Sequence, residues 1–407
     1  MRKMDWLRLL APFLLLLSPT RSPAVAAAVT VQPAPELEGL HRYLVDRRFS
    51  GSVLVARGDK ILLNRGYGMA NYEWNIPADP ETKYKLASVT KQFTAAAILL
   101  LQERGKLSVN DNICKWIDPC PAAWRPVTLH HLLTHSSGVG SPHNLPDFAK
   151  TARLPATPAE LAAMSAALPM DFAPGTQWAY SNGGYNLLGI VIERASGKSY
   201  AEFLRTEIFE PLGMRNSGYD DGKAVLAKRA DGYDFKESKL VRANFEDMSV
   251  PYSAGGLYST VEDLRIWYKA LFGKRFLSEA SLRAMLGEAG GKVRYPTHEY
   301  RGLTLLYGYG LENGPLGRIV LPGFDGKQYF HTGSIEGFRS LATYVPEQDI
   351  TVIAISNVTG VLPLLLLSQK AVAALTGKAE PTKVAPLTPP AGAAPTPAQP
   401  AANAPVR

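Results

Sequence analysis

The sequence predicts an α+β fold in which an antiparallel sheet is built from both chain ends and a helical part lies between them. The prediction depends first on two pairs of β-rich segments separated by turn residues, a pattern typical of β-hairpins. They are residues 51–57 with 60–67 around Gly58-Asp59, and residues 338–345 with 350–356 around Pro346 to Asp349. Between them, the run from Thr94 to Leu101 is apolar almost all round, as in a helix buried on every side.

Two further helices are expected to begin at capping boxes, where Ser is followed three residues later by Glu. These boxes are Ser199-x-x-Glu202 and Ser259-x-x-Glu262. The apolar run from Val361 to Leu367 is too short to span a membrane. It predicts the start of a C-terminal helix that packs on the sheet.

The first 27 residues are typical of a secretory signal peptide. Basic residues precede or enter an apolar run at 9–17 that is too short to cross a bilayer, and mostly small residues, Ala24 to Ala28, follow. We expect cleavage near Ala27, where an Ala-x-Ala pattern lies; an uncleaved N-terminal anchor is the alternative. No stable membrane span is expected after cleavage.

Beyond the signal peptide we expect one domain at 28–378 and a tail at 379–407. The sheet part of the domain is assigned to about 40–87 and 300–378, and the helical part to about 88–299. The tail is rich in Pro and Ala and has few, small apolar side chains, so it is predicted to be disordered.

The composition gives little support for a nucleic-acid partner. The chain has 407 residues, 46% of them hydrophobic, and 44 Lys and Arg against 36 Asp and Glu, a net charge of +8. This excess is modest and is not concentrated in one long run, and no nucleic-acid-reading motif occurs. The expected partner is a small-molecule or peptide substrate, which includes cell-wall peptide.

Ser88 and Lys91 form the first candidate catalytic pair. Their spacing of three places both side chains on one face of a helix, so the amine can reach the hydroxyl. A serine hydroxyl is inert near neutral pH until a base takes its proton. A lysine at the start of a buried helix is partly desolvated, which lowers its pKa and makes the neutral amine available as that base. Alone, this spacing is common by chance.

Two further motifs follow Ser88-x-x-Lys91 in order, Tyr180-Ser181-Asn182 and His331-Thr332-Gly333. With them, the chain resembles the serine β-lactamase and penicillin-binding-protein family over about residues 40–370. It is most similar to the branch of class C β-lactamases, D-alanyl-D-alanine carboxypeptidases and related esterases. The flanks agree: Phe172 to Gly175, Gly184 to Gly189, and Ser253 to Leu257.

The resemblance implies a β-lactamase/transpeptidase-like fold with the active site in a cleft between the sheet and a helical subdomain. It implies three catalytic residues, Ser88 as nucleophile with Lys91 and Tyr180, and leaves open which of the latter two is the general base. Substrate contacts are assigned to Asn182, His331, Thr332 and Gly333, and the oxyanion hole to the backbone N–H groups of Ser88 and Ser334. Gly333 is expected to let the substrate backbone come close. No metal or cofactor is implied.

His331 departs from the more common Lys of the family's K-T-G motif. A histidine with an ordinary pKa is mostly charged only below about pH 6.5. Its attraction for a substrate carboxylate is therefore expected to be weak and pH-dependent. This argues against efficient β-lactamase activity and leaves peptidase or esterase activity open. A partly buried strand histidine without substrate contact is the alternative.

Other candidates for function are weaker. Cys114 and Cys120 predict a small structural disulfide in an exported protein; a redox pair is disfavoured because C-x-x-C spacing is absent. His131 and His135 stand four apart, but no Glu follows His131 as a zinc protease motif would require, so they are expected to cap and pack a helix end.

The sequence therefore predicts a secreted or periplasmic serine hydrolase that acts without a cofactor. Its covalent acyl-serine intermediate would form on a peptide, ester or β-lactam carbonyl. The alternative is a catalytically idle module on the same fold that binds cell-wall peptides.

Overall fold

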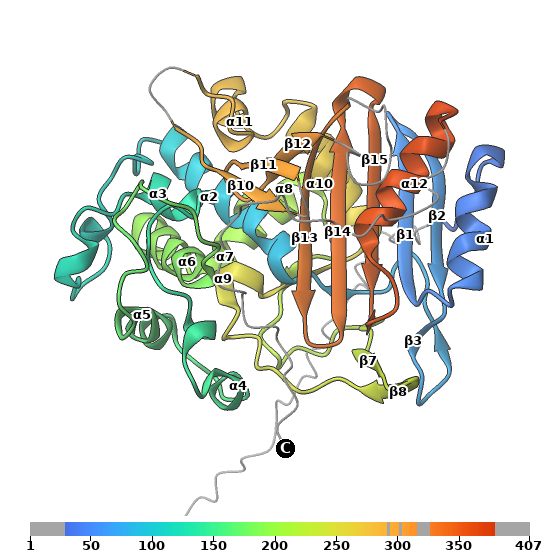
Figure 1. The fold of residues 1–407 in the computed structure, drawn as a ribbon, viewed down its shortest axis with the longest axis horizontal. Helices are drawn as coiled ribbons and strands as arrows, with labels where there is room; N and C mark the ends of the chain where they lie inside the picture. The colour runs from blue at the N-terminus through green and yellow to red at the C-terminus, as the bar shows by residue number, and fades with distance from the viewer. Residues whose placement is uncertain (1–28, 291–293, 301–302, 316–325, 379–407) are drawn as a thin grey trace, which may run out of the picture.

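The computed structural model describes residues 29–290, 294–300, 303–315 and 326–378, which form a sheet with helices on both of its faces (Figure 1). The predicted α+β class, a large antiparallel sheet flanked by helices, is confirmed. The predicted signal peptide at 1–27 and tail at 379–407 lie outside the described residues. The predicted domain boundaries therefore stay predictions.

The main sheet joins strands from both ends of the chain. In the described residues its order is β10-β11-β12-β13-β14-β15-β1-β2, with all neighbours antiparallel. The two predicted hairpins are β1 (Gly51–Arg57) with β2 (Lys60–Tyr67), and β14 (Phe338–Val345) with β15 (Ile350–Ser356). Strand β1 pairs with β15, so Gly51 lies opposite Ser356. The remaining strands are β10 (Thr297–Tyr300), β11 (Leu303–Tyr307), β12 (Glu312–Pro315) and β13 (Lys327–Ile335).

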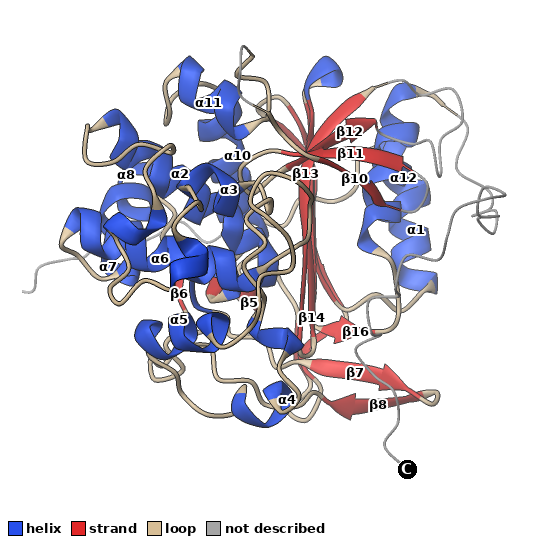
Figure 2. Ribbon diagram, turned by 60° about the vertical axis from the view of Figure 1, so that its left-hand side comes forward, coloured by secondary structure: helices blue, strands red, loops and turns tan. Residues whose placement is uncertain are grey.

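Alternate residues of the central strands enter two different cores. Leu54 packs in the core shared with the helical part, whereas Val53 and Val55 pack in the core beneath α1 (Glu38–Asp46) and α12 (Leu364–Thr376). Successive side chains of a strand point to opposite faces, which is why a strand buried on both faces is a continuous apolar run. Figure 2 shows α1 and α12 on one side of the sheet and most other helices on the opposite side.

The helical part is centred on α2 (Thr90–Glu103), which is buried nearly all round, as its sequence predicts. Helix α6 (Asn182–Ser196) packs against it through shared core residues such as Phe93 and Leu188. The other helices are α3 (Leu129–Leu133), α4 (Phe148–Thr151), α5 (Pro158–Ala166), α7 (Tyr200–Leu204), α8 (Glu210–Leu212), α9 (Tyr252–Gly255), α10 (Val261–Phe272) and α11 (Glu279–Met285).

One of the two predicted helix starts is shifted by a residue. Ser199 caps α7 by accepting a hydrogen bond from the N–H of Glu202, as expected. Helix α10 is capped by Thr260, whose hydroxyl accepts from the N–H of Asp263, and not by Ser259. Ser259 and Thr260 both have the side chain of a good N-cap, so the local sequence alone does not choose between them.

Short strands connect the sheet to the helical part and position the loop that carries Ser88. Strand β5 (Tyr84–Lys85) pairs with β9 (Leu257–Ser259), which in turn pairs with β6 (Gly218–Tyr219). The segments before Ser88 and after Ala254 are thereby held together. The other short strands are β3 (Met69–Asn71), β4 (Ile76–Pro77), β7 (Tyr233–Lys236), β8 (Lys239–Arg242) and β16 (Val358–Thr359).

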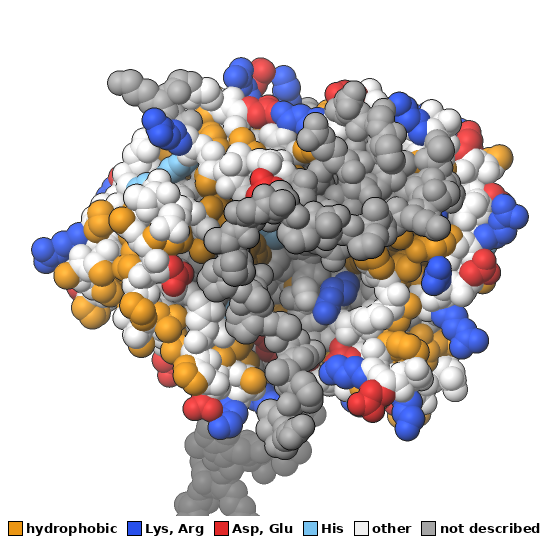
Figure 3. Space-filling view, in the orientation of Figure 1, with side chains coloured by type: hydrophobic (Ala, Val, Ile, Leu, Met, Phe, Trp, Pro, Cys, Tyr) orange, Lys and Arg blue, Asp and Glu red, His pale blue; other side chains and the backbone are white. Residues whose placement is uncertain are grey.

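Cys114 and Cys120 are joined by a disulfide, with their Cα atoms 5.3 Å apart. In the part of the chain that the structure describes, no helix combines the length and apolar character needed to cross a membrane. On the face drawn in Figure 3, basic and acidic side chains are interspersed. This distribution agrees with the modest net charge.

The buried side chain of Asn357 ties three segments together beyond the end of β15. Its Oδ1 accepts from Ser50 Oγ at 3.0 Å, and its Nδ2 donates to the backbone oxygens of Met69 and Asp231, each at 2.9 Å. Asn357→Ala should lower the free energy of unfolding by about 3 kcal/mol, because several buried polar groups lose their partner at once. Urea unfolding measures the change. Asn110→Ala, at an exposed position, is the control and should stay within about 0.5 kcal/mol of the parent; an equal loss in both variants would contradict the prediction.

Candidate active site

Ser88 lies between β5 and α2, in the 3-10 turn η2 (Ala87–Val89). The N–H of Leu86 donates to the backbone oxygen of Leu257 at 2.8 Å, which fixes the chain before Ser88 against β9. Ala87 has a φ of 49°, a left-handed conformation that costs energy for a residue with a Cβ and that is concentrated at functional sites. Ser88 is partly exposed, so its hydroxyl is accessible to a ligand.

Lys91 lies in the first turn of α2 and is fully buried. Its Nζ is 3.2 Å from Ser88 Oγ, 2.8 Å from Asn182 Oδ1 and 2.8 Å from the backbone oxygen of Ala254. Burial lowers the pKa of Lys91 well below its ordinary value, because the ammonium loses its hydration. The structure thus brings together the two residues that the S-x-x-K spacing places on one face.

The contacts of Lys91 determine where its lone pair points. A neutral amine has two N–H donors and one lone pair. Asn182 Oδ1 and the Ala254 carbonyl only accept hydrogen bonds, so together they take both N–H groups. The lone pair is then left for the hydroxyl of Ser88. In this arrangement neutral Lys91 can accept the proton of Ser88.

Tyr180 contacts the same pair. The Nζ of Lys91 lies 4.8 Å from the centre of the Tyr180 ring. Burial raises the pKa of Tyr180 above its ordinary value; a hydrogen bond with Ser88 acts in the opposite direction, and the Glu312 carboxylate raises the pKa further. The phenol therefore keeps its proton at neutral pH. In that state it can donate a proton but cannot act as a base.

The segment that carries Tyr180 and Asn182 is held by His135. The N–H of Ser181 donates to His135 Nδ1 at 3.1 Å, and the N–H of Ala179 donates to the His135 backbone oxygen at 3.0 Å. The imidazole also packs on the Tyr180 ring, with the ring centres 4.3 Å apart. His135 is buried, and burial lowers its pKa well below its ordinary value, so the ring is neutral. It therefore orients the Tyr-Ser-Asn motif without adding charge.

Gly333 of β13 faces η2, and its missing side chain makes that contact possible. A Cβ at this position would lie 2.2 Å from the backbone oxygen of Leu86 and 2.2 Å from Ser340 Oγ. Glycine is required here because β13 approaches the backbone of Leu86 and the side chain of Ser340 in the same chain. This reason was not predicted from the sequence; the predicted one, room for the substrate backbone, stays a prediction.

His331 is buried, and both of its ring nitrogens have partners. Its Nε2 lies 2.9 Å from the hydroxyl of Tyr307, and its Nδ1 lies 2.6 Å from the backbone oxygen of Thr332. Burial, with the nearby Lys91 charge, lowers the pKa of His331 to about 3. The ring is therefore neutral across the ordinary pH range. The sequence-based expectation that His331 becomes charged below about pH 6.5 does not hold in this buried environment.

Thr332 and Ser334 lie on a free edge of β13. Strand β12 pairs with residues Lys327 to Phe330 of β13 but not with the following residues, which have β14 on one side only in the described structure. Ser334 is exposed and Thr332 is partly exposed. An unpaired strand edge can form main-chain hydrogen bonds with an extended ligand.

Several residues at the site were not predicted from the sequence. Ala254 lies in the run from Ser253 to Leu257, whose resemblance to the family was noted, but it was given no role; His135 was expected only to cap and pack a helix end. No motif or spacing in the sequence pointed to Tyr307 or His143. Glu312 is largely buried in β12, and burial raises the pKa of its carboxyl to about 8. All are placed by long-range contacts rather than by a local pattern.

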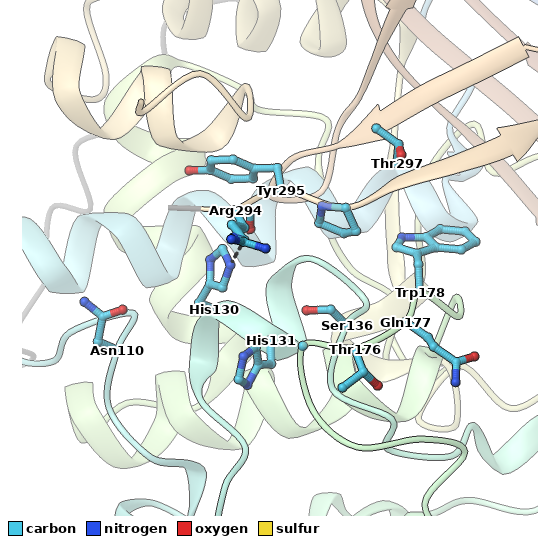
Figure 4. A pocket seen from close by; sticks show the side chains of 12 residues that line it. Asn110, His130, His131, Ser136, Thr176, Gln177, Trp178, Arg294, Tyr295 and Thr297 are labelled. Carbon is cyan, nitrogen blue, oxygen red and sulfur yellow. Dashed lines mark hydrogen bonds between the residues drawn. The ribbon is translucent and has the colours of Figure 1, made fainter. Parts of the chain in front are cut away.

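A separate cavity of about 710 Å³ lies beside this site and is shown in Figure 4. Its walls include His130, Trp178 and Tyr295, and its lining residues do not include Ser88, Lys91 or Tyr180. The segment from Gly175 to Trp178 borders the cavity and leads directly to Tyr180. The cavity is thus a neighbour of the candidate active site and not the site itself.

His131 caps a helix, as expected. Its Nδ1 accepts from the N–H of Thr128 at 3.3 Å, and Thr128 Oγ1 accepts from the His131 N–H at 3.3 Å, at the start of α3. Within the described residues, no group of three or more His, Cys, Asp or Glu residues is placed to hold a metal ion.

The sheet with its flanking helices and the grouping of Ser88, Lys91 and Tyr180 agree with the class of protein that the sequence resembles, the serine β-lactamase and penicillin-binding-protein family. A family model described as Beta-lactamase matches residues 37–374, so the chain belongs to the β-lactamase family. A penicillin-binding protein of Bacillus subtilis (strain 168) is 30% identical over 334 residues, covering 76% of this chain and 68% of that protein. The Teichoic acid D-alanine hydrolase of Staphylococcus aureus (strain MRSA252) is 29% identical over 269 residues, covering 66% of this chain and 65% of that protein.

A solved structure shows the same fold. The octameric penicillin-binding protein homologue from Pyrococcus abyssi superposes with a TM-score of 0.70 at 32% identity, covering 86% of this chain and 78% of that chain. The predicted family resemblance is confirmed by these matches.

Gly333→Ala should disrupt the site through the contact with Leu86. The added Cβ forces β13 away from η2, so the rate at which a serine-directed probe labels Ser88 should fall at least about tenfold, with a stability loss of about 2 kcal/mol. Labelling rates and thermal unfolding measure the two effects. Gly184→Ala is the matched control, since a Cβ there meets Leu132 at an ordinary 3.5 Å. An unchanged labelling rate in Gly333→Ala would contradict the prediction, because it would show that β13 and η2 need not stay in contact for Ser88 to react.

Proposed function

We propose that the protein hydrolyses an acyl substrate through a covalent ester on Ser88. The observation that carries the proposal is the environment of Lys91, which is buried and 3.2 Å from Ser88 Oγ, with both N–H groups taken by other acceptors. A buried amine in this state is a base directed at one hydroxyl. Membership of a family of serine hydrolases supports the same reaction class.

In the first step, neutral Lys91 takes the proton of Ser88 while Oγ forms a bond to the carbonyl carbon of the substrate. The carbonyl π electrons move to oxygen and give a tetrahedral oxyanion. This oxyanion is assigned to the N–H groups of Ser88 and Ser334, and one such donor contributes roughly 3 kcal/mol to stabilising the transition state.

In the second step the bond to the leaving group breaks. Tyr180 is a protonated phenol beside Ser88 and Lys91, so it donates its proton to the departing atom and recovers one from the Lys91 ammonium. Both groups then return to their starting states. Water then attacks the acyl ester: it loses a proton to Lys91 as its oxygen bonds to the acyl carbon, the bond from that carbon to Ser88 Oγ breaks, and Oγ recovers the proton from the Lys91 ammonium as the acid leaves. The assignment makes Lys91 the base and Tyr180 the proton relay.

Among peptide, ester and β-lactam carbonyls, the neutral environment of His331 favours an ester or amide without an adjacent carboxylate. A charged side chain at this position would pair with a carboxylate, whereas the buried His331 is neutral and already hydrogen-bonded. The name of one relative, Teichoic acid D-alanine hydrolase, is consistent with such a substrate. We therefore place small acyl esters first, D-amino-acid wall peptides second and β-lactams third.

The place of action that we propose is outside the cytoplasm, secreted or periplasmic. The signal-peptide pattern at 1–27 and the Cys114–Cys120 disulfide support export, since disulfides persist in oxidising compartments. The relatives include penicillin-binding proteins. Cell-wall peptide or another envelope polymer then becomes the natural partner to test.

A catalytically idle binding module on the same fold is the second candidate. The free edge of β13 between His331 and Ile335 favours it, because that edge can hold an extended peptide without any reaction. The buried amine beside Ser88 favours hydrolysis instead. Wall fragments that bind while an ester, a cephalosporin and a D-Ala-D-Ala peptide all remain intact would select the binding module.

A fluorophosphonate probe should attach to Ser88 in the parent protein and not in Ser88→Ala. Phosphonylation needs the activated hydroxyl, so the intact mass should rise by one probe in the parent only. Mass spectrometry of the intact protein and of its peptides makes the measurement. Ser334→Ala keeps the backbone N–H and serves as the control that should still label. Label on any other serine would reject Ser88 as the nucleophile.

The rate of ester hydrolysis should decrease as the pH falls through the pKa of Lys91. Only the neutral amine accepts the Ser88 proton, and because burial lowers this pKa well below 10.5, activity should extend down toward neutral pH before it declines. Lys91→Arg stays charged and should be slower by about 1,000-fold. A profile of kcat/KM against pH tests both points. A Lys91→Arg enzyme with near-parental rate would exclude lysine as the base.

A further inference from the structure

The side chain of Asn182 lies between Lys91 and a histidine that had no role so far. Its Oδ1 accepts from Lys91 Nζ at 2.8 Å, and its Nδ2 lies 3.3 Å from His143 Nδ1. An amide nitrogen only donates, so His143 Nδ1 must be the acceptor. The neutral imidazole therefore carries its proton on Nε2. Ser141 Oγ, 3.2 Å from the same Nδ1, donates to it as well.

The two ends of an asparagine amide have nearly the same shape, so hydrogen bonds alone select its orientation. If the amide of Asn182 were reversed, its NH₂ group would face Lys91 and donate to the amine lone pair. That lone pair would then no longer be free for Ser88. With the proton kept on His143 Nε2, the reversed Oδ1 would also face the lone pair of Nδ1, an acceptor against an acceptor, so reversal of the amide requires the imidazole proton to move to Nδ1. The observed orientation is the one that suits both the lone pair of Lys91 and the Nε2-protonated form of His143.

We propose that His143 is a positioning residue which fixes the amide of Asn182 and so reserves the Lys91 lone pair for Ser88. This inference rests on the proposed function. His143 lies in the 3-10 turn η5 (Pro142–Asn144), and its ring packs on Phe148 with the ring centres 4.1 Å apart. His143 is an exposed residue, but the partial desolvation of its ring and the Lys91 charge lower its pKa to about 4. The ring is thus neutral at pH 7, and Nδ1 stays an acceptor.

Three substitutions at position 143 separate the acceptor from the shape of the side chain. His143→Leu removes the acceptor. His143→Asn places an amide oxygen near the position of Nδ1, whereas His143→Gln places its amide near the position of Nε2. Labelling of Ser88 by the fluorophosphonate and steady-state ester hydrolysis are measured for each, with thermal unfolding to show that the fold is kept. His41→Leu, on α1 and away from the site, is the matched control.

We expect His143→Leu to reduce the labelling rate and kcat by about tenfold with KM nearly unchanged, the effect of one lost oriented hydrogen bond. His143→Asn should recover to within about threefold of the parent, and His143→Gln should not. Equal rates in His143→Leu and the parent would overturn the inference. Full recovery by His143→Gln, or a change in KM alone, would also overturn it, since either result indicates a direct substrate contact through Nε2.

A double-mutant cycle with Asn182→Asp tests the coupling directly. A carboxylate has two oxygens and no orientation to fix, so His143→Leu should cause less than about a twofold further loss in the Asn182→Asp background, measured at a pH high enough to keep Lys91 neutral beside the added charge. Independent, multiplicative losses would overturn the inference. Labelling of the parent protein separates the proposed function from the role of His143. If the parent does not label at Ser88, the proposed function is rejected. If the parent labels and substitutions at position 143 leave the rate unchanged, only the role of His143 is rejected.

Discussion

The burial of Lys91 is the constraint on which the rest of the site depends. Lys91 has no solvent exposure, and no carboxylate of the described residues is in hydrogen-bonding contact with it, so the ammonium form is unfavourable and the group responds by releasing its proton. Two carbonyl-type acceptors then satisfy its N–H groups, one from α6 and one from α9. The α9 acceptor is itself fixed, because the N–H of Ala254 donates to Asn186 Oδ1 at 3.2 Å. The proposed nucleophile is thus activated by packing that reaches well beyond the site.

The aromatic and imidazole groups around Lys91 add contacts without adding charge. Burial lowers the pKa of His135 and His331 and raises that of Tyr180, so all three are neutral near pH 7. A charged histidine at either position would repel a protonated Lys91, and a phenolate at Tyr180 would stabilise it. The neutral surroundings therefore leave desolvation as the dominant influence on the lysine. They also agree with a substrate that brings no carboxylate to this part of the site.

The hairpins could be predicted from the sequence because turn residues and apolar runs act over a few neighbours, as at Gly58-Asp59 between β1 and β2. The same local reasoning misplaced the start of α10 by one residue, since Ser259 and Thr260 are both good caps. It also missed one physical reason for a glycine at position 333. A sequence shows that a backbone must approach closely at a glycine, but it does not show that the approaching atom belongs to Leu86 of the same chain.

For the candidate site, the sequence by itself determined the order of the motifs and the spacing that puts Ser88 and Lys91 on one helical face. Those features depend on helix geometry and on residue type, which are local properties. Only the tertiary structure decided that Lys91 is fully buried, that Ala254 and Asn182 accept its two N–H groups, and that His135 and His143 hold the motif between them. These contacts join residues far apart in the chain, so their distances are set by how the sheet and the helices pack and cannot be read from any short segment.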